Sequence, residues 1–138
     1  MTVLVAYDGS DPARAAVEYT LKEHSNDEVV LLRVVEAAGG TTDAGFELVR
    51  EQLRDRREEV SATTAEQLQD ILDETDSPVE LETVVGDPAN EIVAYADEHG
   101  VDHIVVGSYG RGGVSRVLLG SVAETVARRS AVPVTIVR

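Results

Sequence analysis

The chain has 138 residues, 43% of them hydrophobic and only 4% aromatic, so we expect one domain, residues 1–138, around an aliphatic core. Its formal net charge of −14 argues against partners such as nucleic acid or anionic membranes. The absence of cysteine excludes disulfides and thiolate metal sites. The sequence shows neither an apolar run of membrane-spanning length nor a signal peptide, which predicts a cytoplasmic location.

The charge comes from 26 acidic residues against 12 basic ones, and Lys22 is the only lysine. This composition resembles that of proteins from halophilic archaea, in which surface carboxylates stay hydrated in concentrated salt. An ordinary acidic protein from a mesophile is the alternative, because composition by itself is only a prior.

The first half of the chain predicts two strands and two helices. Thr2–Tyr7 is rich in β-branched residues, and Asp11-Pro12 then supplies a helix cap with proline at the first helical position. A second strand is expected at Glu28–Val35. An apolar stripe then predicts a long helix from about Asp43 to Glu74, with its charged face in solvent.

The second half repeats the alternation of strand and helix. Val79–Val85 predicts the third strand, and Asp87-Pro88 again provides a cap and a proline for the helix that follows. The fourth strand is expected at Asp102–Gly107. A last helix opening at Gly120-Ser121 leads to a final strand at Val132–Val137.

This order of elements predicts an α/β fold: a single doubly wound, five-stranded parallel sheet with helices on both faces, similar to a Rossmann fold. Such sheets bind ligands at the carboxyl ends of their strands, where the strand order reverses. We therefore expect the functional site in the loops that follow strands. These loops are Asp8–Asp11, Glu36–Gly45, Gly86–Pro88 and the stretch that starts at Gly107.

The stretch GSYGRGGVSRVLLGSVAET, from Gly107 to Thr125, is unusual because four of the chain's eleven glycines fall within its first seven residues. Glycines there leave backbone N–H groups open to a ligand. Gly120-Ser121 opens a helix whose N-terminus offers free amides and the positive end of the helix dipole. The two elements together predict a binding site for an oligophosphate, and a purely structural loop is the alternative.

Two candidate residues have simpler alternatives. Ser121 fits a capping box, in which Ser121 caps the last helix and Glu124 reaches back to it. Asp8 fits a turn in which its carboxylate bonds the amides of Gly9 and Ser10. Neither the Walker P-loop pattern nor a dinucleotide fingerprint after the first strand is present.

The spacing Gly107, two residues, Gly110, nine residues, Gly120-Ser121 resembles the nucleotide-binding motif of ATP-binding universal stress proteins. The opening VLVAYDGSDPARAA, the segment GDPANEIVAYADEHGVDHIVVGSYG and the closing AVPVTIV are also similar to that family. The resemblance covers the whole chain. It implies ATP, with Mg²⁺, in the cleft between the first and fourth strands, and a homodimer paired through Val132–Val137.

The same resemblance implies roles for individual residues. Asp8 would lie near the ribose and the metal-bound phosphates, with Ala6 and Tyr7 flanking the adenosine. The backbone of Val34 would read the edge of the adenine. The phosphates would be held from one side by Gly107, Tyr109 and Gly110, and from the other by Gly120, Ser121 and Val122.

The sequence indicates no catalytic residues. His24 is expected at the exposed end of the first helix, His99 at the end of the third and His103 within the fourth strand, and none follows metal-ligand spacing. The leading hypothesis is an ATP-binding regulatory module of the stress response. A weak ATPase or phosphotransferase using the same cleft, and a structural dimer that binds no nucleotide, are the alternatives.

Overall fold

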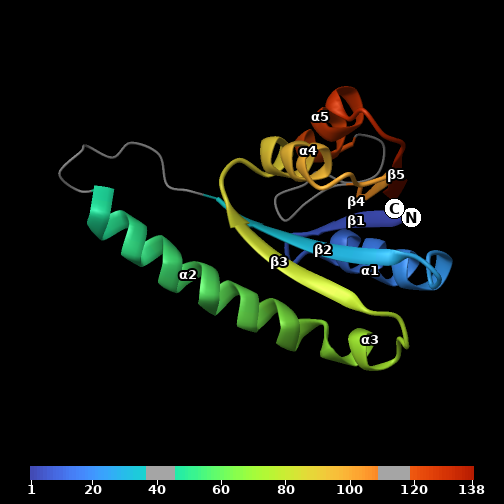
Figure 1. The fold of residues 1–138 in the computed structure, drawn as a ribbon, viewed down its shortest axis with the longest axis horizontal. Coiled ribbons are helices and arrows are strands. Elements are labelled where there is room, and N and C mark those ends of the chain that lie inside the picture. Colours follow the sequence, from blue (N-terminus) through green and yellow to red (C-terminus); the bar gives the residue numbers. More distant parts are fainter. Residues whose placement is uncertain (37–45, 109–118) are drawn as a thin grey trace.

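The computed structural model describes residues 1–36, 46–108 and 119–138, except for the side chains of residues 46–53. The strands are β1 (Thr2–Tyr7), β2 (Glu28–Val35), β3 (Val79–Val85), β4 (His103–Gly107) and β5 (Val134–Val137). The helices are α1 (Asp11–Glu23), α2 (Phe46–Gln67), α3 (Gln69–Asp73), α4 (Pro88–Glu98) and α5 (Ser121–Arg129). Figure 1 shows their arrangement.

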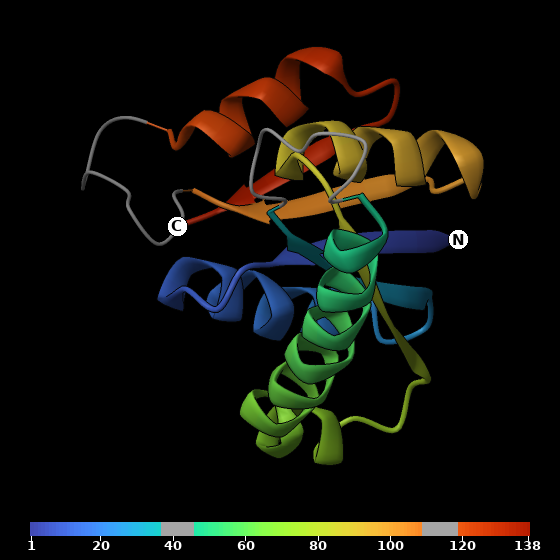
Figure 2. The same cartoon turned by 90° about the vertical axis from the view of Figure 1, so that its left-hand side faces the viewer.

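All strand pairs are parallel, and the sheet order is β3-β2-β1-β4-β5, which confirms the predicted α/β fold. Helices α1, α2 and α3 lie on one face, and α4 and α5 lie on the other (Figures 1 and 2). The strand order reverses at β1, with β4 on its far side from β2, so the carboxyl ends of β1 and β4 form the expected switch point. Strands β3 and β5 are the two edges.

The sheet separates two aliphatic core clusters because successive strand residues point to opposite faces. Leu4, Leu32 and Ile104 belong to the cluster under α4 and α5. Val5 and Leu31 belong to the cluster under α1 and α3. The aliphatic core expected from the composition is therefore divided between the two faces of one sheet.

The first helix starts from a different cap than predicted. The N-cap of α1 is Ser10, whose Oγ accepts a hydrogen bond from the amide of Ala13 at 3.2 Å, and Asp11 is already helical. The prediction that Asp11 caps this helix was wrong. The corresponding prediction for α4 is confirmed, since Asp87 accepts from the amide of Asn90 at 3.1 Å and Pro88 follows it.

The long helix predicted to run to Glu74 is broken at Leu68, which separates α2 from α3. The side chain of Leu68 is fully buried in the core cluster under α1. Arg14 Nη1 donates to the carbonyl oxygen of Gln67 at 3.0 Å, just before the break. The break between α2 and α3 thus coincides with contacts to α1 and to the core, and the local sequence contains no signal for it.

The last strand is shorter than predicted. The Oγ of Ser130 accepts from the amide of Val132 at 3.0 Å and donates to its carbonyl oxygen at 2.7 Å. Both backbone groups of Val132 are therefore engaged in a local turn, and β5 begins at Val134. Within residues 1–36, 46–108 and 119–138, no helix is both long and apolar enough to cross a membrane.

Candidate functional site

The turn after β1 is held by Asp8. Its Oδ1 accepts hydrogen bonds from the amide of Ser10 at 2.9 Å and from Ser10 Oγ at 2.5 Å. Gly9 has φ of +87°, in the left-handed region that favours glycine. The turn predicted as the simpler role of Asp8 is therefore formed with Ser10. In the part of the chain that the structure describes, the hydrogen bonds of Asp8 use only Oδ1, which leaves Oδ2 for a metal ion or a donor.

The last residue of β4, Gly107, packs directly against the first turn of α1. A Cβ atom on Gly107 would lie 2.7 Å from the carbonyl carbon of Pro12 and 2.9 Å from the amide nitrogen of Ala13. Both are backbone atoms that cannot move aside. Close packing between β4 and α1 therefore requires glycine at this position, whether or not a ligand is bound.

Ser108 joins the end of β4 to the start of α5. Its amide donates to the carbonyl oxygen of Val137 at 2.8 Å, and its own carbonyl oxygen accepts from the amide of Gly120 at 2.6 Å. The residue is 8% exposed. The sequence reasoning missed Ser108, because a backbone hydrogen bond between distant segments has no residue pattern.

Helix α5 begins without a side-chain cap. Its N-cap is Gly120, with φ of −62° and ψ of 156°, and Ser121 is the first helical residue. The predicted capping box is therefore wrong. Glu124 instead pairs with Arg128 at 2.5 Å, one turn further along the helix. Ser121 stays exposed. The first amides of a helix have no intrahelical acceptor, and within the described part of the chain those that follow Gly120 have no other one, so they can meet an anion.

The predicted adenosine residues divide between the two faces of the sheet. Ala6 and Val34 are half-buried against the core cluster under α4 and α5, and so is Val122, which was predicted to contact the phosphates. Val84, the register partner of Val34 on β3, lies on the same face and was not predicted as a site residue. The alternation of β3, together with its register against β2, is the signal that could have indicated it.

The side chain of Tyr7 points to the opposite face, toward α1. It is 5% exposed, and its hydroxyl donates to Gln67 Oε1 at 3.2 Å. Burial raises the pKa of the Tyr7 phenol, while the positive charge of Arg33, 5.8 Å from the ring centre, opposes that rise. Tyr7 can therefore meet a ligand beside Ala6 only through its backbone.

The structure therefore brings four predicted residues to the carboxyl ends of β1 and β4: Asp8, Gly107, Gly120 and Ser121. Asp8 is joined to the start of α1 by Ser10, and Gly107 packs on the same turn of α1. Ser108 then ties Gly120, and with it Ser121, to the end of β4. Tyr109 and Gly110 lie outside the described residues, and so do Arg111 and Arg116, which the sequence offers as positive charges for a phosphate.

The model of the universal stress protein family matches residues 1–138. The chain belongs to this family. The universal stress protein YxiE of Bacillus subtilis is 37% identical over 144 residues, an alignment that covers 99% of this chain and 97% of that protein.

Two solved structures of universal stress proteins are similar to this family member along its whole length. The protein UspA from Lactobacillus plantarum has a TM-score of 0.85 at 27% identity and covers 100% of this chain and 97% of its own. A universal stress protein in complex with cAMP has a TM-score of 0.61 at 31% identity, with coverage of 100% and 96%.

The histidines of this universal stress protein lie away from that edge. His24 lies at the end of α1 as predicted, but it is not exposed there, because its side chain is 15% exposed and its ring faces that of His103. His99 is exposed and stacks on Tyr95 with ring centres 3.9 Å apart. Among the described residues, no group of three or more His, Asp or Glu is placed to hold a metal ion.

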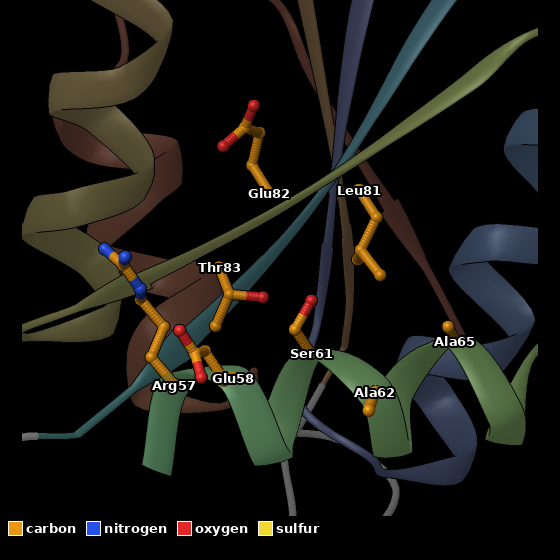
Figure 3. A pocket seen from close by; sticks show the side chains of 8 residues that line it. All are labelled: Arg57, Glu58, Ser61, Ala62, Ala65, Leu81, Glu82 and Thr83. Carbon is orange, nitrogen blue, oxygen red and sulfur yellow. The ribbon is translucent and has the colours of Figure 1, made fainter. Parts of the chain in front are cut away.

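A groove of about 560 Å³ separates α2 from the edge strand β3. Leu81 and Thr83 point toward α2, whereas Glu82 points to the other side of β3 (Figure 3). Helix α2 lines the groove with small side chains at Ser61, Ala62 and Ala65 and with long charged ones at Arg57 and Glu58. The lining residues are Arg57, Glu58, Ser61, Ala62, Ala65, Leu81, Glu82 and Thr83. None of the predicted nucleotide residues is among them.

Proposed function

We propose that this protein is an ATP-binding regulatory module of the stress response and that it acts as a homodimer. The uncapped N-terminus of α5 carries the proposal, because the bond from Gly120 to Ser108 fixes it beside the end of β4. Free amides and the positive end of a helix dipole favour an anion at that place. Asp8 directly follows β1, the strand that pairs with β4.

An adenine nucleotide is the anion that we propose. The similar structure that holds cAMP supports this class of ligand. Ala6, Val34 and Val84 offer a half-buried aliphatic surface on the α4 and α5 face, which suits the flat apolar surface of a base. The backbone of Tyr7 and Val34 would border the adenosine.

The phosphates would lie between the two remaining groups of residues. Gly107, Tyr109 and Gly110 would contact them from the β4 side, and Ser121 and Val122 from α5. The Gly120 amide already binds Ser108, so this residue would contribute close approach of the backbone rather than a hydrogen bond.

A divalent cation fits the charge of this site. ATP brings several negative charges to a chain of net charge −14, and Asp8 adds a carboxylate at the strand end. Mg²⁺ prefers carboxylate and phosphate oxygens, and it would offset the repulsion between them. The Oδ2 atom of Asp8 is the protein ligand that we propose for it.

The remaining parts of the proposal concern the whole molecule. Residues 1–138 form one universal stress protein domain, located in the cytoplasm. Two copies pair through the last strand, Val132–Val137, whose β5 part lies at a sheet edge with every residue half-buried. The surplus of carboxylates reflects an origin in a halophilic archaeon, so we expect the melting temperature to rise as KCl is raised from tenths of a molar to molar concentrations.

Nucleotide content tests the proposed function most directly. We expect protein purified in its native salt to release adenine nucleotide on denaturation, measured by absorbance and mass spectrometry. Emptied protein should melt at a higher temperature with millimolar ATP and Mg²⁺. Protein that is purified empty and does not respond to ATP would contradict the proposal. Steady ATP turnover above that of a Gly120→Val variant would favour the ATPase instead.

A further inference from the structure

His24 and His103 face each other at the amino ends of the strands, opposite the proposed nucleotide site. Their ring centres are 5.4 Å apart, and the ring planes are inclined by 52°. His24 is the C-cap of α1, and His103 is the first residue of β4. The pair therefore joins the C-terminal end of α1 to the sheet.

Each ring has a second partner. His24 Nδ1 lies 3.0 Å from Asp27 Oδ2. Because a carboxylate only accepts, Nδ1 carries the hydrogen of neutral His24, and Nε2 is the atom that binds a second proton. His103 Nε2 lies 2.6 Å from Thr135 Oγ1 on β5. The cluster thus connects α1, the turn before β2, and the edge strand β5.

The surrounding charges treat the two rings differently. Asp27, which also lies 3.9 Å from the Met1 ammonium group, is a counter-ion for a His24 imidazolium. The ion pairs formed by the described residues include none for His103. The other titratable groups nearby are Tyr19, whose ring centre lies 6.5 Å from that of His24, and Asp102, which accepts from the amide of Thr2 at 2.9 Å.

We propose that the His24–His103 pair is a proton-operated contact, in which a charge on both rings separates the end of α1 from β4 and β5. Two imidazolium rings at this distance repel each other, and among the ion pairs of the described residues only that of His24 with Asp27 offsets such a charge. The contact lies at the end of the sheet opposite the proposed nucleotide site. It reaches Thr135 in the middle of the strand that we propose for pairing two copies.

The direction of the pH effect follows from His103. Burial, and then the neighbouring His24, lower the pKa of His103 below its ordinary value of 6.5. The unfolded chain therefore binds a proton at His103 more readily than the folded one. The stability that the neutral ring provides is present above pH 6.5 and is lost as the pH falls from there through the folded-state pKa.

The first test compares melting temperatures at pH 7.5 and pH 5.5, in one salt concentration, for the wild-type protein and the variants His103→Gln and His99→Gln. We expect the acid-induced fall to be smaller in His103→Gln by about 2–5 °C, because this variant has no ring to protonate at position 103. His99→Gln is the matched control, because His99 is exposed at the C-cap of α4, and the melting temperature of this variant should fall as far as that of the wild type. An equal fall in all three proteins would overturn the proposal.

The second test does not depend on how His103→Gln folds. NMR titration of the His103 ring in His24→Gln should give a pKa higher than in the wild type, because the neighbouring charge is gone. Amides of Val134–Val137 should also exchange faster at pH 5.5 in the wild type than in His24→Gln at the same pH. An unchanged His103 pKa in His24→Gln would show that the rings do not interact and would overturn the proposal.

Discussion

The amide of Gly120 donates a 2.6 Å hydrogen bond to the carbonyl oxygen of Ser108. This bond fixes the residue before α5 to the residue after β4, so the two ends of the glycine-rich stretch meet. A ligand that reaches both ends can use the amides that follow Gly120, since the Gly120 amide itself is engaged.

Ser121→Ala should lower ATP affinity without lowering stability. Ser121 is exposed and caps no helix, so its loss should change the free energy of unfolding by less than about 0.5 kcal/mol. Ser10→Ala is the matched comparison, because Ser10 does cap α1, and it should cost about 1 kcal/mol. Urea denaturation and calorimetric titration with ATP measure both quantities. Equal losses of unfolding free energy in the two variants would indicate that Ser121 caps α5 after all and would contradict the prediction.

Asp8→Asn keeps an oxygen that can accept from Ser10 but removes the negative charge. We expect a loss of ATP affinity in Mg²⁺ of at least about tenfold, which is 1.4 kcal/mol of binding free energy. Adenosine, which has no phosphates, is the control ligand and should bind both proteins alike. A parallel loss for adenosine would place the defect in the turn rather than in the metal site.

Tyr7→Phe should reduce stability and leave nucleotide binding unchanged. The variant removes the hydrogen bond from the Tyr7 hydroxyl to Gln67, so the free energy of unfolding should fall by about 1 kcal/mol. The hydroxyl lies on the α1 face, away from Ala6 and Val34, so ATP affinity should stay within a factor of about two. A large loss of affinity at unchanged stability would put the hydroxyl in the binding site.

Gly107→Ala should destabilise the fold whether or not ATP is present. The added methyl group would collide with the backbone of Pro12 and Ala13, and overpacking of this kind costs about 1–3 kcal/mol. Chemical denaturation of the nucleotide-free protein measures this loss. If the variant is as stable as the wild type and only binds ATP more weakly, the glycine serves the ligand and not the packing of α1.

Glu82→Gln should stabilise the protein at neutral pH. Burial, and then a hydrogen bond and repulsion from Glu80, raise the pKa of the Glu82 carboxyl. A raised folded-state pKa means that the protonated form favours folding, and this contribution is lost as the pH rises through that pKa. Because Glu82 is partly exposed, we expect a gain of at most about 0.5 kcal/mol at pH 7. The gain should vanish below pH 4, and a constant gain at both pH values would contradict this cause.

The sequence predicted the fold well because its signals are local. The bounds of β1, β2 and β3 are those expected from their β-branched residues. Strand alternation also indicates that Ala6 and Tyr7 face opposite sides, a consequence that the family resemblance obscured. The errors in the predicted bounds arose where contacts between distant segments determine where an element ends. At Leu68, for example, the long helix breaks beside the hydrogen bond from Arg14 to Gln67.

The candidate site was only partly predictable for the same reason. A Ser-x-x-Glu pattern favours a capping box, but the backbone bond from Gly120 to Ser108 holds the chain so that Gly120 is the cap. The sequence pattern indicated that Gly107 binds a ligand, but the close packing of Gly107 on the backbone of α1 by itself requires glycine there. The spacing of residues in the sequence does not predict this contact. Such contacts depend on how the elements pack, which a residue pattern does not record.

The two edges of the sheet differ in a way that limits how copies of this protein can assemble. Strand β5 has no charged residue, whereas β3 carries Glu80 and Glu82. Two copies that meet through β5 would leave only β3 strands at their outer margins. A further copy would have to bring its own carboxylates against that margin, and like charges on an edge strand resist such pairing. The strand order therefore favours a closed pair over an open-ended fibre.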